Sequence, residues 1–451
     1  MPEEIMLKLS VFMSPTGAHV GGWRLPEAIT DAGFNFDRWP DLMKLLERGK
    51  FDMMFLADGN GVNGISDPDL LARNPTLRPV VFEPITFLAA LATHTSRIGL
   101  VATGTTTFEE PFSIARRFAA VDQISKGRAG WNVVTTSNPD DALNFSRTEH
   151  VEHSDRFARA EEFLDVTDGL WSSWDEDAFV QDKENGIFLD SSKVHMLNHE
   201  GEHFQVRGPL NAAHTPQGRP VIVVAGGSPE ARNLAARTAD VLFTLTETKE
   251  AALDLYKDVK ERVAGYGRAP EALKVMPGAS IFVGETADEA EEVYRKLQEL
   301  IPDTVGVATL SRIMAQDLSM HDPCDPMPEI TTETKGMTFF RDKVSAMAKK
   351  EGLSIRETYR RVLPARGHVL MKGSAADVAD QIEDWYRSGA CDGFNLVASH
   401  LPGGLEKIVQ HLVPELQRRG LFREEYEGTT LREHLETPYA AFPARRSDVD
   451  Q

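Results

Sequence analysis

Short apolar runs rich in β-branched residues alternate along the chain with longer stretches in which apolar residues recur at helical spacing. This alternation is typical of βαβ units, in which parallel strands are joined by helices. Strands are predicted over residues 7–13, 51–57, 98–103, 129–134, 221–225, 241–244, 274–283 and 393–397. Helices are predicted over residues 36–48, 84–95, 111–124 and 155–174.

Eight strands separated by helices predict an α/β fold of the (β/α)8 TIM-barrel type, in which the parallel sheet closes on itself. An open doubly wound sheet is the alternative. It is disfavoured because no G-x-G-x-x-G motif follows the first strand.

Two insertions interrupt the alternation, at about residues 175–219 and 302–366. The second contains a loop rich in Pro, Asp and Met over residues 320–328 and a helix-like stretch over 342–362. Insertions of this length are usually lids or interfaces. We therefore expect one barrel domain over residues 1–437. The chain becomes charged after about Leu421, and residues 438–451 are expected to be a mobile tail.

The composition narrows the class of protein. The chain has 451 residues, of which 41% are hydrophobic and 26% charged, as in ordinary globular proteins. Two cysteines, Cys324 and Cys391, fit a reducing compartment better than a disulfide framework. A net charge of −20 argues against a nucleic-acid partner. No signal peptide or membrane-spanning apolar run is present, so we expect a cytoplasmic protein without membrane contacts.

Barrel enzymes build their active sites at the carboxyl ends of the strands. Asp58 follows the second predicted strand and Thr103 ends the third, while Asn132 lies within the fourth and Thr136 just after it. Each has a structural alternative: an aspartate caps turns, and threonine is a good strand former. Asn132 is the most informative, because a buried amide must be paired.

The loop after the first strand and the turn after the fifth add further candidates. His19 and Trp23 lie in the first loop, which is either a substrate lip or a surface loop with one packed tryptophan. In the second, Gly226-Gly227-Ser228-Pro229 joins a strand to a helix, and the free N–H groups of that helix suit a phosphate. Glu230 would compete for the same N–H groups, and an ordinary capped turn is the alternative.

Metal and serine chemistry are not expected. The pairs His150/His153 and His199/His203 lack the H-E-x-x-H pattern, and no G-x-S-x-G elbow is present. The residues alone therefore predict an α/β barrel that binds a phosphorylated cofactor, and they leave the reaction open.

Several stretches at these positions resemble the bacterial luciferase-like flavin monooxygenases, and in particular the nitrilotriacetate/EDTA/dibenzothiophene-sulfone monooxygenase branch. They include Phe51-Asp-Met-Met-Phe-Leu-Ala-Asp58, Gly127-Arg-Ala-Gly-Trp-Asn-Val-Val-Thr135 and Arg156-Phe-Ala-Arg-Ala-Glu-Glu-Phe163. The resemblance implies a TIM barrel that uses FMN as FMNH2, delivered by a separate NAD(P)H flavin reductase. It also implies reaction with O2 through a flavin C4a-(hydro)peroxide that oxidises a small organic substrate, by C–N or C–S cleavage or hydroxylation.

The resemblance also assigns residues. It places Asp58 and Thr103 at the isoalloxazine edge and Asn132 and Thr136 at the end of the fourth strand. It places the remaining residues toward the ribityl phosphate (His153, Phe157), at the phosphate loop (Gly227, Ser228) and on the open flavin face (His19, Trp23). Phe157 and Thr136 depart from the branch, where Tyr and Ser are common. We expect His19 to be the proton donor and the insertion at 302–366 to be a lid.

Other functions remain open at this stage. A deazaflavin (F420)-dependent oxidoreductase could use the same barrel, as could a non-catalytic flavin-binding protein or a metal-dependent hydrolase. A homodimer or homotetramer is expected by analogy with the family. The substrate is not defined by the sequence.

Overall fold

A computed structural model of the protein describes residues 6–330, 339–365 and 367–438. In this part of the chain, eight parallel strands form a closed barrel, because β1 pairs with both β2 and β11 while β8 pairs with β9. The barrel strands are β1 (Lys8–Met13), β2 (Met53–Leu56), β3 (Gly99–Thr105), β4 (Ala129–Val134), β7 (Val221–Ala225), β8 (Val241–Thr244), β9 (Lys274–Gly284) and β11 (Gly393–Ala398). The predicted barrel is confirmed, and the open sheet is wrong.

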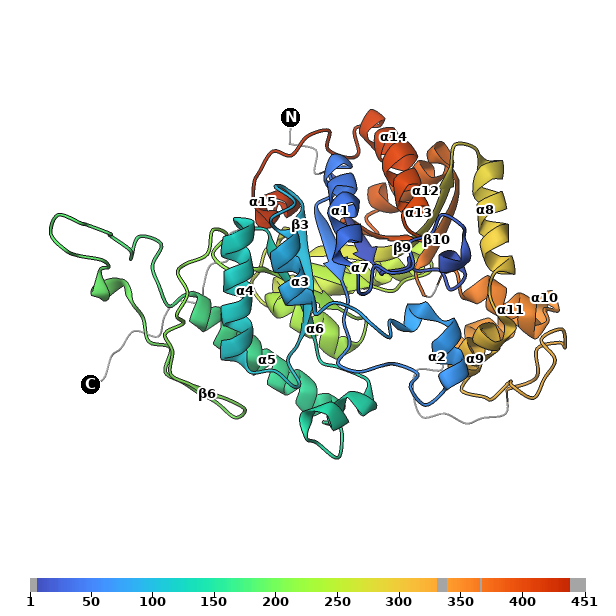
Figure 1. Ribbon diagram of the computed structural model, residues 1–451, viewed down its shortest axis with the longest axis horizontal. Coiled ribbons are helices and arrows are strands. Elements are labelled where there is room, and N and C mark those ends of the chain that lie inside the picture. Colours follow the sequence, from blue (N-terminus) through green and yellow to red (C-terminus); the bar gives the residue numbers. More distant parts are fainter. Residues whose placement is uncertain (1–5, 331–338, 366, 439–451) are drawn as a thin grey trace.

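Helices surround the barrel on its outer side (Figure 1). They are α1 (Trp39–Arg48), α3 (Pro84–Leu91), α4 (Pro111–Ser125), α5 (His153–Trp171), α6 (Pro229–Thr238), α7 (Lys249–Gly265), α8 (Ala287–Glu299), α12 (Ala375–Arg387), α13 (Gly403–Lys407) and α14 (Val413–Arg418). Proline in the first turn begins several of them, since its missing N–H has no partner to lose there. Among the helices of the described residues, none has the length and apolar character needed to cross a bilayer.

The first insertion projects away from the barrel and carries the two-stranded hairpin of β5 (His199–Glu200) and β6 (Gln205–Val206) (Figure 1). The second insertion contains α9 (Asp303–Met314), α10 (Phe339–Glu351) and α11 (Ile355–Val362), which pack beside α2 (Pro68–Arg73). The helix-like stretch predicted over 342–362 is therefore two helices. Gly352, with φ +66°, ends the first of them. Helix α9 and the outer strand β10 (Val369–Ser374), which pairs with β9, were not predicted.

Helix α15 (Leu431–Leu435), near the C-terminus, closes the end of the barrel at which the strands begin. Leu431 and Leu435 pack among apolar residues of the lumen such as Met53 and Val221. The charged stretch that begins after about Leu421 is therefore not mobile up to Pro438, because it folds onto the barrel. The rest of the predicted mobile tail, residues 439–451, lies outside the described residues.

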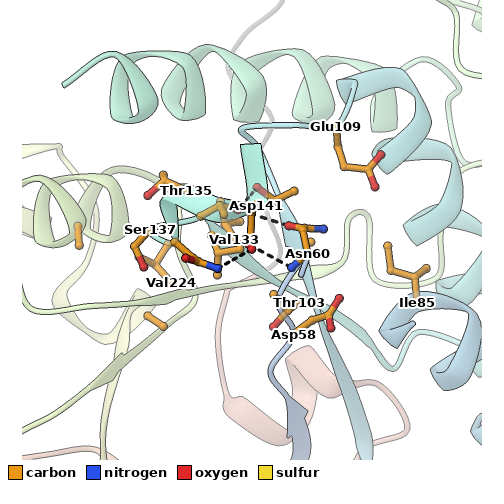
Figure 2. A pocket seen from close by; sticks show the side chains of 18 of the residues that line it. Asp58, Asn60, Ile85, Thr103, Glu109, Val133, Thr135, Ser137, Asp141 and Val224 are labelled. Atoms are coloured by element: carbon orange, nitrogen blue, oxygen red, sulfur yellow. Dashed lines mark hydrogen bonds between the residues drawn. The ribbon is translucent and has the colours of Figure 1, made fainter. Parts of the chain in front are cut away.

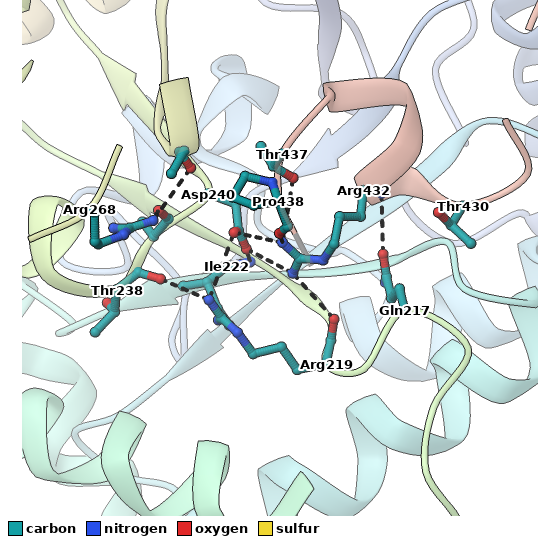
Figure 3. Close-up of polar contacts among 12 residues, drawn as sticks. Gln217, Arg219, Ile222, Thr238, Asp240, Arg268, Thr430, Arg432, Thr437 and Pro438 are labelled. Atoms are coloured by element: carbon teal, nitrogen blue, oxygen red, sulfur yellow. Dashed lines mark hydrogen bonds and ion pairs between the residues drawn. The ribbon is translucent and has the colours of Figure 1, made fainter. Parts of the chain in front are cut away.

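An ion-pair network fixes α15 to the barrel (Figure 3). Asp240, which precedes β8, accepts bonds from the Arg432 guanidinium at 2.8 and 3.2 Å and from the Ile222 backbone N–H at 2.8 Å. Arg219 lies 3.7 Å from the same carboxylate. Burial would raise the pKa of Asp240, but the charges of Arg432 and Arg219 lower it below its usual value. The network joins the C-terminal helix to strands β7 and β8.

Candidate functional site

A polar cavity of about 420 Å³ lies at the carboxyl ends of β2, β3, β4 and β7 (Figure 2). Strand-end and loop residues line it, which is where the barrel fold was expected to build a site. Three of the predicted site residues that line it come from different elements: Asp58, Thr103 and Thr136. Phe157 of α5 lines its far end, where it approaches α6.

Asp58 follows β2 and is the titratable group most changed by this cavity. Burial raises the pKa of Asp58 to about 6, although the Gly59 N–H and the charge of Arg78 act in the opposite direction. Arg78 donates to the Ala57 carbonyl at 2.9 Å, so its guanidinium is held beside the carboxylate. A carboxyl with this pKa changes its charge close to neutral pH, which makes it a candidate functional group.

Thr103 lines the cavity and forms a hydrogen-bond chain with Asn132, which is not itself among the lining residues. The Thr103 hydroxyl donates to the Leu56 carbonyl at 2.9 Å, and this uses its only proton. It must therefore accept from the Asn132 amide nitrogen, which lies 2.8 Å away. This fixes the orientation of the amide. Asn132 is 2% exposed, and within the described chain its Oδ1 atom has no donor. A buried acceptor of this kind is a cost to the protein unless a ligand supplies an N–H.

Thr136 holds a strained backbone at the edge of the same cavity. Its φ of +31° lies in the left-handed region, which is unusual for a β-branched residue. His150 Nε2 contacts the Thr136 carbonyl oxygen at 2.9 Å, Arg156 donates to the same oxygen, and the Thr136 hydroxyl lies 2.7 Å from that of Thr105. Strain that neighbours hold in place is found most often at functional sites.

The residues predicted to bind phosphate lie beyond Phe157. The His153 ring packs on Phe157 with 5.0 Å between ring centroids. Ser228 caps α6 by accepting from the Ala231 N–H, and the space beside Gly227 is open. Glu230 accepts bonds from its own N–H and from the Ser228 hydroxyl, which, with the field of His153, lower its pKa. None of His153, Gly227 and Ser228 lines the cavity itself. An anion bound at Ser228 would meet the Glu230 carboxylate, because Glu230 accepts from the Ser228 hydroxyl.

His19 and Trp23 do not line this cavity. His19 is 3% exposed and lies between the barrel and α8. Its Nδ1 accepts from the Gly21 N–H at 3.0 Å, so in the neutral ring the proton is on Nε2, 3.2 Å from the Gln298 side-chain amide. Trp23 lies in the short 3₁₀ helix Gly22–Arg24, and its indole nitrogen is buried. These contacts hold the loop, and a role of either residue toward substrate remains a prediction.

Several polar residues that line the cavity were not predicted as site residues, among them Asn60, Arg78, Asn138 and Asp141. Asp141 accepts from the Asn60 N–H at 3.2 Å and from the Asn138 amide at 2.7 Å (Figure 2). This joins the loop after β2 to the loop after β4. Arg78 sits at φ +54°, a conformation uncommon for arginine. The signal in the sequence for Asn60 and Asp141 is the density of Asn and Asp after strand ends.

No group of three or more His, Cys, Asp or Glu side chains that could hold a metal ion is found in residues 6–330, 339–365 and 367–438. In the described structure, His199 and His203, which were considered as a metal pair and not expected to bind a metal, both contact Glu162. His199 Nε2 lies 2.9 Å from one carboxylate oxygen, and the His203 N–H donates to the other at 2.8 Å.

The chain matches the family described as luciferase-like monooxygenase over residues 12–392. It is 48% identical over 436 residues to N-acetyl-S-(2-succino)cysteine monooxygenase of Bacillus subtilis (strain 168), covering 96% of this chain and 97% of that protein. It is 45% identical over 437 residues to nitrilotriacetate monooxygenase component A of Aminobacter aminovorans, covering 95% and 96%.

Among solved structures, a riboflavin lyase with modified FMN and riboflavin superposes with a TM-score of 0.80 at 30% identity, covering 95% of each chain. The protein therefore belongs to the luciferase-like monooxygenases and is an oxidoreductase. The family and branch predicted from the motifs are confirmed.

Proposed function

We propose that this protein is a two-component monooxygenase, which uses FMNH2 and O2 to oxidise a small organic substrate by C–N or C–S cleavage or hydroxylation. The observation that carries the proposal is the buried carbonyl oxygen of Asn132, which needs an N–H donor beside a polar cavity at the barrel mouth. A flavin ring has such donors, and the riboflavin lyase structure contains a modified FMN.

The residues present fit a flavin. Asp58, Thr103 and Asn132 would meet the polar edge of the ring, and Thr136 and Phe157 would border the route toward the sugar phosphate. Ser228 and Gly227 would receive the phosphate at the start of α6, where free N–H groups and the helix dipole favour an anion. Glu230 would have to turn away from Ser228 for the phosphate to bind.

Reduced FMN, when bound, supplies the two electrons that activate O2. The tasks left to the protein are to orient the ring, to hold Asp58 in one charge state and to exclude water. We propose that helices α9, α10 and α11 of the second insertion act as the lid that excludes water. His19 remains our proposal for a proton donor, and this role requires its ring to leave the Gln298 contact.

A separate NAD(P)H flavin reductase is proposed to supply FMNH2. The name of the nitrilotriacetate relative, component A, supports a second protein component. The acidic net charge of −20 gives no reason to expect nucleic acid as a further partner.

The proposal is tested by anaerobic titration of the protein with FMNH2, oxidised FMN and reduced F420, followed by mixing with O2. We expect FMNH2 to bind most tightly and O2 consumption to yield oxidised substrate once a substrate is added. Tight binding of oxidised FMN with no substrate-dependent O2 use would instead identify a flavin-holding protein. Preferential binding of reduced F420 would identify a hydride-transfer enzyme.

The charge of Asp58 should control flavin affinity. The ionised carboxylate accepts a stronger, charge-assisted hydrogen bond than the protonated carboxyl, so affinity for FMN is expected to fall as the pH is lowered from about 7.5 to about 5, through the pKa of about 6. Asp58→Asn keeps an acceptor oxygen but cannot titrate, and it should flatten this dependence. Fluorescence titration in the same buffers measures both proteins, so that the phosphate of FMN, whose second pKa is about 6, contributes equally.

Glu109→Gln is the matched control, because Glu109 lines the same cavity but pairs with Arg117 at 2.6 Å. This variant should keep the wild-type pH dependence. An unchanged dependence in Asp58→Asn would show that another group titrates.

A further inference from the structure

A second cavity, of about 650 Å³, lies beside the first and is lined differently. Its walls are mainly apolar: Val20, Leu77, Leu245, Ile313, Val362 and Leu363. One side is the barrel mouth after β8, and the other is formed by α9, α10 and α11 of the second insertion. Volumes of roughly 300–1,000 Å³ with apolar walls and few polar groups are typical of small-molecule sites.

The two cavities are neighbours at the same end of the barrel. Leu77 lines the second cavity and Arg78, the next residue, lines the first. A molecule in the second cavity would therefore lie next to one in the first. Because the proposed function assigns the first cavity to a flavin, the second is free to take the organic reactant.

The net charge of the lining residues has opposite sign in the two cavities. The first has four carboxylates and one arginine, whereas the second has two cations and one carboxylate. In the second cavity, Lys343 of α10 forms an ion pair with Glu247 of the loop after β8. Arg312 of α9 has no ion-pair partner within the described ranges. A net positive lining is unusual in a chain of net charge −20, and it favours an anionic ligand.

A second polar group points to a ligand independently of the charges. Thr246 lines the cavity and is 7% exposed, and in the described structure its hydroxyl oxygen has no hydrogen-bond partner. An unpaired buried hydroxyl is costly, and a polar atom of a ligand would satisfy it. The cavity thus combines apolar walls with one buried hydroxyl, that of Thr246, and one exposed arginine, Arg312.

We propose that the second cavity is the substrate chamber and that Arg312 selects substrates with an apolar body and a terminal carboxylate. This inference rests on the proposed function, since it assigns the first cavity to the flavin. The Lys343–Glu247 ion pair joins α10 of the insertion to the loop after β8, so it holds the two walls of the chamber together. Arg312, an exposed residue of the cavity lining, meets the anionic end of the substrate.

The test uses the full chain without flavin and two probes of the same shape, 4-phenylbutyrate and 4-phenylbutan-1-ol. Isothermal titration should show that the wild type binds the carboxylate about tenfold more tightly than the alcohol, as one charge-assisted hydrogen bond would give. Arg312→Gln should remove this preference while leaving binding of the alcohol unchanged. Ile313→Trp, which fills the chamber, should weaken binding of both probes.

Arg295→Gln is the matched control, because Arg295 is an exposed arginine on α8 that lies outside the cavity lining. It should keep the preference. Equal binding of the two probes by the wild type, or a preference that survives in Arg312→Gln, would overturn the proposal.

FMNH2 titration of the same variants separates the assignment of the first cavity to flavin from the assignment of the second to substrate. If FMNH2 fails to bind while the carboxylate preference persists, the flavin function fails and the anion chamber stands. If Arg312→Gln weakens FMNH2 as much as the carboxylate probe, the cavity belongs to the flavin and the chamber is overturned.

Discussion

Asn132→Leu is expected to lower the affinity for FMNH2 by about 10- to 100-fold, which corresponds to about 1.4–2.7 kcal/mol, while leaving the protein folded. Leucine has nearly the same shape as asparagine but offers no acceptor to the flavin. In the free protein the change removes a buried oxygen that has no donor within the described chain. Thr103 keeps its bond to the Leu56 carbonyl. Stability of the flavin-free form should therefore change by less than about 1 kcal/mol.

Two measurements are needed, anaerobic fluorescence titration with FMNH2 and thermal unfolding of the flavin-free protein. Asn395→Leu is the control, because Asn395 on β11 is also 2% exposed with an Oδ1 that lacks a donor in the described residues. It pairs in register with Ser10 of β1, which does not line the cavity, whereas Asn132 pairs with Thr103, which does. Only Asn132→Leu should affect the flavin. Equal loss in both variants would mean that the effect is structural.

The sequence predicted the strand-end part of this site for a definite reason. Once eight parallel strands close into a barrel, residues that end neighbouring strands must meet, and Thr103 and Asn132 are in register on β3 and β4. Asp58 follows from the same argument on β2. Arg78, Asn60 and Asp141 lie in loops, whose course depends on local contacts that periodicity does not encode.

His19 does not line the cavity, and the sequence missed this for the same reason: that a residue follows a strand does not determine the direction in which its loop runs. Gly17 packs so closely on His400 that an added Cβ would lie 2.5 Å from the His400 Cα atom. This contact draws the loop toward β11 and carries His19 to Gln298 instead of the cavity. Helix α15 was missed because five residues are too few to show a helical period.

Asp240→Asn is expected to cause the largest loss of stability, about 3–5 kcal/mol. The amide would leave the buried guanidinium of Arg432 without a counter-charge, whereas Arg219 would keep Asp168 at 3.8 Å. The side chains of Asp240 and Arg432 are each 4% exposed, so water cannot replace the lost interaction. For a chain of this size the midpoint of thermal unfolding should fall by about 3–5 °C.

The pH dependence of the wild type follows from the same carboxylate. Because the pKa of Asp240 is lowered in the folded protein, its contribution is present above the unfolded aspartate pKa of about 3.9. It is lost as the pH falls through the folded value. Below that range, wild type and Asp240→Asn should converge in stability, and unfolding by urea at a series of pH values measures this.

Asp384→Asn is the control, since Asp384 pairs with Lys249 on the surface and is 60% exposed. Exposed pairs contribute about 0–1 kcal/mol, so little change is expected. The double variant Asp240→Asn/Arg432→Met should recover part of the loss, because it removes the guanidinium charge that the single variant leaves unpaired. If Asp240→Asn unfolds at the wild-type temperature, α15 is held by Leu431 and Leu435 alone, and the ion network does not stabilise the barrel.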